Sequence, residues 1–250
     1  MQVKEIKTKT LNPPQDNLLS VIEKSFLDYG IKEKSIIVVT SKVVSIWEGR
    51  CVKISEVKNK DELIRQEADL YIERQNISNF DVMLTIKNNI LIPSAGIDES
   101  NANGYYILWP KNPFKSAKNI YNFIKKNCKT PDGKNLKEFG VIISDSHTTP
   151  LRAGITGIGI SFFGFNPLRD YRNKKDIFGK ELKMSQTNIV DSLAASAVYC
   201  MGEGAEQSPI AIIEDSRVEF GENFLQDINI KPDDDIYSPV IKSVQWKNKK

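Results

Sequence analysis

The sequence predicts a mixed α/β fold, because short β-branched runs alternate along it with amphipathic segments of helical period. The runs Ser35–Thr40 and Val141–Ile143 are continuously apolar, as in strands that are buried on both faces. A wide apolar stripe over residues 189–201 has the spacing of a helix that packs along one side. We expect a single domain over residues 1–250. The turn-rich loop 130–135 is the best candidate for a boundary between two lobes.

The first half of the chain predicts helices joined to short strands. Asp16 is expected to cap a helix that carries Leu18 and Ile22 on one face and ends at Gly30. A second helix is predicted over Asp61–Ile72, because its apolar residues recur at helical spacing. Further elements are expected in this order: strands Met83–Ile86 and Ile90–Ile92 around a hairpin turn at residues 87–89, a strand at Tyr105–Leu108, and a helix around residues 117–124.

The second half predicts a strand at each side of a long helix. Ile155–Ser161 alternates glycine with isoleucine, which indicates a strand that another element approaches closely. Gly202 is expected to cap the helix over residues 189–201, and Pro209–Ile213 then resumes a strand. Helices and strands are therefore mixed throughout.

Composition excludes several classes of protein. Of the 250 residues, 40% are hydrophobic, and no run approaches the roughly 20 apolar residues of a membrane-spanning helix. The start of the chain lacks the apolar core of a secretory signal, so we expect a cytoplasmic protein. The net charge of +3 comes from scattered basic residues, which disfavours a nucleic-acid partner. Three separated cysteines and the single His147 leave oxygen ligands for any metal, which favours magnesium, manganese or calcium.

Three polar loops are the candidate functional segments. Pro93–Asn101 presents Asp98 after a strand, Ser144–His147 presents Asp145, and Met201–Pro209 presents Glu203. Magnesium bound to nucleotide phosphates takes only one or two protein carboxylates, so two ions need a few acidic side chains from separate loops. We expect these three loops to meet in space.

Each loop also has an ordinary structural explanation. The first could be a turn with an Asx hydrogen bond, Asp145 a helix cap, and the third a helix exit. The glycines of residues 154–159 do not match the dinucleotide fingerprint, and close strand packing explains them better. Ser41-Lys42 follows a strand, where it could reach phosphates, although a lone lysine there is more often at the surface. His147 could be a base, a ligand or a satisfied polar residue, and it lacks the context of a serine nucleophile.

At these loops the chain resembles the coenzyme F-420 gamma-glutamyl ligase family. The segments that carry the resemblance occur in the family's order over nearly the whole chain: Val38–Ser45 with Glu48–Arg50, Ser94–Asn101, Ile143–Ser146, Pro150–Gly154, Asn166–Asp170 with Asp176–Lys180, and Met201–Pro209.

The resemblance implies a GTP-dependent ligase that uses Mg²⁺ or Mn²⁺, with a family-specific fold of two intimately associated lobes and an intertwined homodimer. It implies that the metal ligands are Asp98, Asp145, Ser146 and Glu203. It also implies that nucleotide contacts come from Ser41, Lys42 and Asn101, and from the loop residues Met201, Gly202, Glu203, Gly204, Ala205, Glu206, Gln207 and Ser208. A loose match at residues 11–14 falls where the family also touches nucleotide.

Two places depart from the family pattern. Ile46 stands where the family usually has a lysine, and Thr148-Thr149 stand where it usually has Gly-Arg. The loss of two cations affects the acceptor side more than the metal site. We therefore expect an acceptor that is a folate-like or other glutamate-tailed compound, or the deazaflavin coenzyme.

The expected reaction joins the amino group of L-glutamate to the acceptor carboxylate through an acyl phosphate. Lys42 and Arg152 are the candidate catalytic cations that offset the remaining negative charge. Two alternatives stay open: a non-catalytic homologue that binds nucleotide and metal, and a metal-dependent phosphohydrolase.

Overall fold

The computed structural model describes residues 1–74, 82–224 and 228–248. Its centre is a five-stranded sheet in the order β1-β12-β2-β8-β9. These strands are β1 (Gln2–Ile6), β12 (Ile210–Glu214), β2 (Ser35–Thr40), β8 (Phe139–Thr148) and β9 (Ile155–Phe163). β2 and β8 run parallel, whereas the other neighbours are antiparallel. The predicted mixed α/β fold is confirmed.

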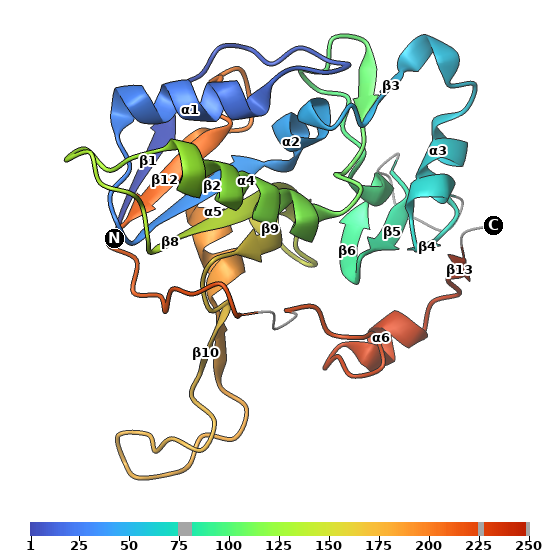
Figure 1. The fold of residues 1–250 in the computed structure, drawn as a ribbon. Helices are drawn as coiled ribbons and strands as arrows, with labels where there is room; N and C mark the ends of the chain where they lie inside the picture. The colour runs from blue at the N-terminus through green and yellow to red at the C-terminus, as the bar shows by residue number, and fades with distance from the viewer. Residues whose placement is uncertain (75–81, 225–227, 249–250) are drawn as a thin grey trace.

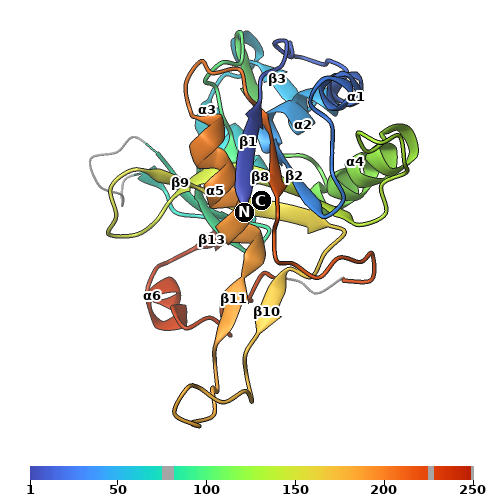
Figure 2. The same ribbon diagram turned by 90° about the vertical axis from the view of Figure 1, so that its left-hand side faces the viewer.

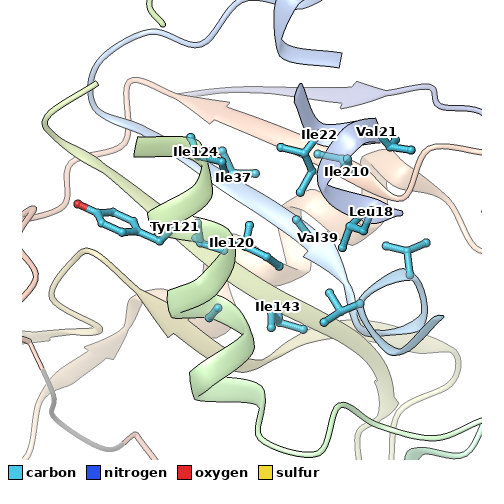
Figure 3. Close-up of a cluster of buried hydrophobic side chains, with 14 of the residues drawn as sticks. Leu18, Val21, Ile22, Ile37, Val39, Ile120, Tyr121, Ile124, Ile143 and Ile210 are labelled. Carbon is cyan, nitrogen blue, oxygen red and sulfur yellow. The ribbon is translucent and has the colours of Figure 1, made fainter. Parts of the chain in front are cut away.

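Helices cover both faces of this sheet, as Figure 2 shows. On one face lie α1 (Leu18–Tyr29), α2 (Ser41–Trp47) and α4 (Pro113–Asn127), and on the other lies α5 (Ile189–Met201). The strands alternate accordingly: Ile37 and Val39 of β2 face the first layer, while Ile36 and Val38 face α5. Figure 3 shows part of the first layer, in which α1 and α4 pack on β2, β8 and β12. Each fully buried isoleucine contributes about 2 kcal/mol through the hydrophobic effect.

The connection from β2 to β8 contributes most strands of two smaller sheets that lie beside the large one (Figure 1), and β13 near the end of the chain adds one more. The ribbon β3–β7 pairs Cys51–Lys53 with Tyr105–Ile107. A second sheet, in the order β13-β4-β5-β6, contains Lys247–Asn248, Leu70–Tyr71, Leu84–Lys87 and Ile90–Pro93. The short helices of this region are η1 (Ile54–Glu56), α3 (Lys60–Glu67) and η3 (Ser94–Gly96), and α6 (Ser238–Lys242) precedes β13. A third apolar cluster packs beneath α3.

A two-stranded arm of β10 (Leu168–Asp170) and β11 (Gln186–Asn188) projects from the large sheet (Figure 1). Ile177 and Phe178 in this arm are 91% and 90% exposed. The arm therefore offers apolar surface that the described chain leaves uncovered. An isolated two-stranded hairpin is also only marginally stable in water.

Two predicted elements were wrong in detail. The N-cap of α1 is Asn17 and not the predicted Asp16. The Asn17 side chain accepts from the backbone N–H of Ser20 at 3.1 Å, whereas the Asp16 carboxylate already accepts from the backbone N–H of Asn12. The predicted helix Asp61–Ile72 ends at Glu67, and Leu70–Tyr71 instead pairs with β5 as a strand. Ile64, Ala68, Tyr71 and Ile72 are all buried although the helix stops short of the last three, so apolar spacing alone could not place its end.

β8 also continues beyond the predicted strand Val141–Ile143, and Ser144–Ser146 lie within it. The hairpin β5–β6, the strand β9 and the helix α5 are confirmed. The close-packing explanation for the glycines of β9 holds: a Cβ at Gly157 would lie 2.6 Å from the carbonyl oxygen of Ala194, and one at Gly159 would overlap Val190. The loop 130–135 connects α4 to β8, two elements that share one core, and the lobe boundary there stays a prediction.

Candidate active site

A cavity of about 440 Å³ opens where the parallel strands β2 and β8 reach their carboxyl ends. Ligands in open α/β sheets bind at this end of parallel strands. All three segments that the sequence singled out contribute to its wall, although Ser144–His147 lies within β8 and not in a loop. The wall is formed by Thr8–Leu11, Thr40–Val43, Ile46, Asp98, Asn101, Asn103, Ser144–Ser146, Val198 and Met201–Pro209.

Asp98 enters the cavity from a tightly turned segment. Ser94, Ala95 and Gly96 have successive positive φ angles of 52°, 53° and 70°. The buried hydroxyl of Thr85 accepts from the backbone N–H of Ala95 at 2.8 Å and helps to hold this turn. Two backbone hydrogen bonds then pair Asp98 with Ile107, at 3.0 and 2.8 Å. The backbone of Asp98 is therefore fixed before its carboxylate meets any ligand.

The carboxylate of Asp98 has a cationic partner. The Lys42 ammonium lies 2.7 Å from its Oδ2, and the backbone N–H of Ser100 donates to Oδ1 at 2.7 Å. Burial opposes the charge of Asp98, but Lys42 and Ser100 outweigh burial and lower its pKa. Asp98 is thus held as a carboxylate.

Asp145 lies across the cavity on β8. Its Oδ1 accepts from the backbone N–H of Ser146 at 2.9 Å, and its Oδ2 accepts from the indole Nε1 of Trp109. Burial, together with the nearby charge of Asp98, raises the pKa of Asp145 to about 6, although these donors act in the opposite direction. A cation between the two carboxylates would relieve this repulsion.

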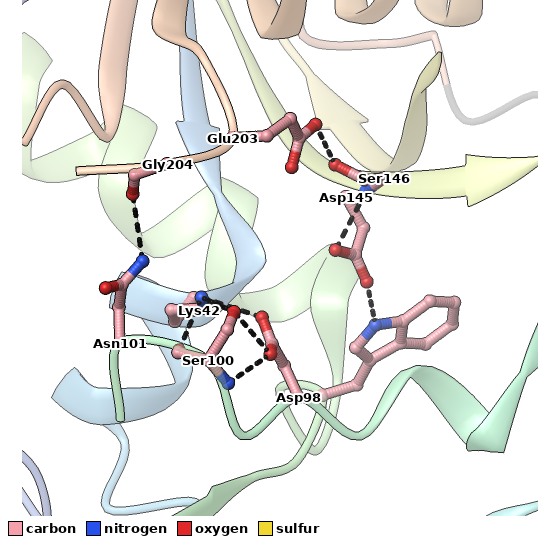
Figure 4. A network of polar contacts seen from close by, with 9 residues as sticks. Lys42, Asp98, Ser100, Asn101, Asp145, Ser146, Glu203 and Gly204 are labelled. Atoms are coloured by element: carbon pink, nitrogen blue, oxygen red, sulfur yellow. Dashed lines mark hydrogen bonds and ion pairs between the residues drawn. The ribbon is translucent and has the colours of Figure 1, made fainter. Parts of the chain in front are cut away.

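Glu203 follows α5 and completes the acidic side of the cavity (Figure 4). The hydroxyl of Ser146 donates to its Oε1 at 2.5 Å. The loop that carries Glu203 is joined to the Asp98 loop, because Asn101 Nδ2 donates to the carbonyl of Gly204 at 2.9 Å. Within the same loop, Glu206 accepts from the Gly204 N–H at 2.7 Å. Residues far apart in the sequence therefore form one polar network.

The donor set of this network suits a hard divalent cation. Asp98, Asp145, Ser146 and Glu203 offer only oxygen atoms, which Mg²⁺ and Mn²⁺ prefer. In the described part of the chain, no three His, Cys, Asp or Glu side chains converge closely enough to hold a metal ion by themselves. A metal on a nucleotide needs only one or two protein carboxylates and takes its other ligands from phosphate and water. The residues present therefore fit a metal–nucleotide complex better than a free metal ion.

The structure also places the remaining predicted residues. Ser41, Lys42, Asn101 and all residues of Met201–Ser208 line the cavity. Arg152 is exposed on the β8–β9 connection and is not part of the wall, so its catalytic role stays a prediction. Thr149 is exposed on the same connection, whereas Ile46 is 2% exposed and reaches the cavity from α2.

The sequence analysis missed Trp109 as a residue of the site. Its side chain is 1% exposed, and it donates to Asp145 from outside the polar loops. The sequence shows only an apolar residue after a predicted strand. No sequence signal could have revealed the direction of its indole N–H.

The described residues contain no helix with the length and apolar character needed to cross a bilayer.

Comparison with known proteins gives a consistent result. The family described as F420-0:Gamma-glutamyl ligase matches residues 5–215. The chain is 34% identical over 223 residues to a coenzyme F420:L-glutamate ligase of Methanococcus maripaludis strain C7, covering 84% of this chain and 87% of the relative. A protein of the same name from Methanocaldococcus jannaschii is 31% identical, covering 84% and 86%. Another from Methanosarcina acetivorans is 26% identical, covering 87% and 89%. The chain therefore belongs to the F420-0:gamma-glutamyl ligase family, whose members are enzymes that form carbon–nitrogen bonds.

Proposed function

We propose that the protein is a GTP- and divalent-metal-dependent ligase that adds L-glutamate through its amino group to an acceptor carboxylate. The observation that carries this proposal is the single cavity shared by Lys42, Asp98, Asp145, Ser146 and Glu203. A loop that presents backbone amides and glycines, Met201–Ser208, forms another part of the same wall. Oxygen ligands in the wall of a cavity of about 440 Å³ suit a metal–nucleotide substrate.

The proposed chemistry has two steps. An oxygen of the acceptor carboxylate attacks the γ-phosphorus of GTP, the bond to GDP breaks, and an acyl phosphate forms. The amino nitrogen of glutamate then attacks the acyl carbon, phosphate leaves, and the nitrogen loses a proton as the amide forms. Phosphorylation is needed because a free carboxylate is a poor acylating agent.

The protein's part in these steps is positioning and charge neutralisation. Lys42 is held 2.7 Å from Asp98 and supplies a fixed positive charge at the cavity. Asp98, Asp145, Ser146 and Glu203 would hold Mg²⁺ or Mn²⁺, which supplies Lewis-acid stabilisation of the transferred phosphoryl group when bound. Ser41, Asn101 and the Met201–Ser208 loop would position the nucleotide.

The acceptor is a small molecule that ends in a carboxylate, either a deazaflavin coenzyme or a folate-like compound with a glutamate tail. The relatives' names favour the deazaflavin coenzyme. The apolar Ile46 in the cavity wall, where the family usually has a lysine, is the feature of this chain that favours a folate-like acceptor. The enzyme acts in the cytoplasm, with neither a membrane nor a nucleic acid as partner.

The test is a phosphate-release assay on the purified protein with GTP or ATP, Mg²⁺ or Mn²⁺, glutamate and each acceptor in turn. We expect release that requires glutamate, metal and one acceptor, and a product heavier by one glutamate residue in mass spectrometry. Nucleotide binding in calorimetry without any release would indicate a non-catalytic homologue. Release that needs no glutamate would indicate a phosphohydrolase.

We also propose that two copies form a homodimer through the β10–β11 arm. The reason is that this arm carries Ile177 and Phe178, two large apolar side chains that are exposed. Light scattering on the wild-type protein should give twice the chain mass. The double variant Ile177→Asp/Phe178→Asp should give the monomer mass. The control variant Leu27→Asp, at an exposed position of α1, should leave the dimer intact. A wild-type monomer would exclude this assembly without affecting the ligase proposal.

A further inference from the structure

Trp109 lies on a segment that links Asp98 and Asp145, the two acidic residues that reach the cavity from different sheets. Asp98 follows the small sheet that contains β6, and Asp145 belongs to the large sheet. The segment ending in Trp109 contacts both of them. Ile107 makes two backbone hydrogen bonds to Asp98, and two residues later the indole of Trp109 donates to Oδ2 of Asp145.

The indole is held in place from several sides. Arg50 Nε donates to the backbone carbonyl of Trp109 at 3.1 Å, and the ammonium of Lys87 lies 5.7 Å from the ring centroid. Gly96 packs directly on the indole, because a Cβ at this position would overlap Nε1. Its φ of +70° also favours glycine. A side chain that is 1% exposed and confined in this way has few other orientations available.

The N–H of a buried indole needs an acceptor, and Asp145 supplies it. The indole donates to Oδ2 of Asp145, and the backbone N–H of Ser146 donates to Oδ1. Together the two hydrogen bonds fix the plane of the carboxylate. Partners that orient a metal ligand in this way typically change metal affinity by about 10- to 100-fold when they are removed.

We propose that Trp109 is a positioning residue that orients Asp145 for the divalent cation and keeps it in register with Asp98. This inference rests on the proposed function, because it assumes that Asp145 holds the metal. It adds a residue that has no ligand atom for the metal and lies outside the polar loops.

The first experiment measures Mn²⁺ affinity by electron paramagnetic resonance with GTP present. Trp109→Phe keeps an aromatic ring and removes the donor, and we expect its Mn²⁺ Kd to rise about tenfold. The matched control is Trp47→Phe, a partly buried tryptophan of the main core that is not part of the cavity wall. Its Kd should stay within about twofold of wild type. Equal Kd values for wild type and Trp109→Phe would overturn the inference.

A second measurement keeps the inference testable if Trp109→Phe does not fold. Replacing Trp109 with 3-benzothienylalanine preserves the bicyclic shape and exchanges the N–H for sulfur, so a tenfold loss of Mn²⁺ affinity at unchanged thermal stability would support a positioning role. The chain has three tryptophans, so the indole N–H signals of ¹⁵N-labelled protein can be assigned by substitution. Mg²⁺ with GTP should shift the Trp109 signal and leave the Trp47 signal in place.

The outcomes separate the two proposals. Wild-type protein that binds no Mn²⁺ with GTP would overturn the proposed function, and this inference with it. Wild-type binding that Trp109→Phe and the benzothienyl variant both retain would overturn the positioning role alone.

Discussion

The ammonium of Lys42, in the first turn of α2, lies 2.7 Å from Oδ2 of Asp98, on the loop after η3. Lys42 also donates to the backbone carbonyl of Ser100 at 2.9 Å, so one side chain joins α2 to the Asp98 loop. Asp98 therefore has a fixed cationic partner at the wall of the cavity.

Lys42→Met should lower the rate of phosphate release about 100-fold, as the loss of one preorganised charge at a transferring group typically does. Steady-state kinetics at saturating GTP and Mg²⁺ measure this loss.

The matched control is Lys60→Met. Lys60 forms a similar ion pair, at 2.8 Å, with Glu99, the residue that follows Asp98 in the sequence. An exposed pair of this kind contributes about 0–1 kcal/mol, so turnover should hardly change. Equal activity of Lys42→Met and Lys60→Met would remove Lys42 from the mechanism.

Ser146→Ala should raise the Mg²⁺ concentration needed for half-maximal turnover about tenfold. The hydroxyl is expected to ligate a metal, and it also holds Glu203 at 2.5 Å. Thr148→Ala, an exposed position of the same strand, is the control. If both variants follow the wild-type Mg²⁺ dependence, Ser146 is not a metal ligand.

Gly159→Ala should destabilise the protein by about 1–3 kcal/mol, because the new methyl group would overlap Val190 of α5. Urea denaturation gives the free energy of unfolding. Combining the change with Val190→Ala removes the overlapping atom, so the double variant should lose less stability than the sum of the single ones. Additive losses would show that the helix does not approach the strand as described.

Glu67 gives a pH-dependent stability. It lies 2.7 Å from both Arg50 and Lys87. Burial opposes its charge, but the two cations outweigh burial and keep its pKa below the ordinary value of 4.5. A carboxylate with a lowered pKa stabilises the folded state above its ordinary pKa, and this contribution is lost as the pH falls below 4.5.

Glu67→Gln should therefore cost about 3 kcal/mol at pH 7, with a cost that shrinks steadily in urea titrations below pH 4.5. The exposed Glu62 on the same helix is the control, and Glu62→Gln should cost at most about 1 kcal/mol. A cost of Glu67→Gln that does not vary with pH would show that its ionisation adds no stability.

The parts of the fold that the sequence predicted are those in which local pattern and burial agree. β2 is apolar on both faces because helices cover both, and the glycines of β9 follow from the approach of α5. The end of α3 was not predictable, because Ala68 and Tyr71 have helical spacing and are buried although they follow the helix and Tyr71 pairs with β5. Tertiary pairing decided that boundary.

The candidate site was predictable in its residue types and not in its contacts. Asp98, Asp145 and Glu203 could be chosen as acidic residues in polar segments, and the structure places them on one cavity. Their individual partners depend on side-chain directions set by packing. The Lys42–Asp98 pair and the Trp109–Asp145 bond join residues 56 and 36 positions apart, beyond the reach of any local pattern.

The strand order of the large sheet has a consequence for biosynthesis. β12 lies between β1 and β2, although it is made after both, and β8 is the other neighbour of β2. β1 and β2 therefore do not pair with each other, and both must wait for residues 210–214 to form the hydrogen bonds that join them through β12. Until then β2 is an apolar edge exposed to other nascent chains. A chain that ends before residue 210 should therefore depend on chaperones, whereas a chain that includes residues 210–214 supplies the strand that joins β1 to β2.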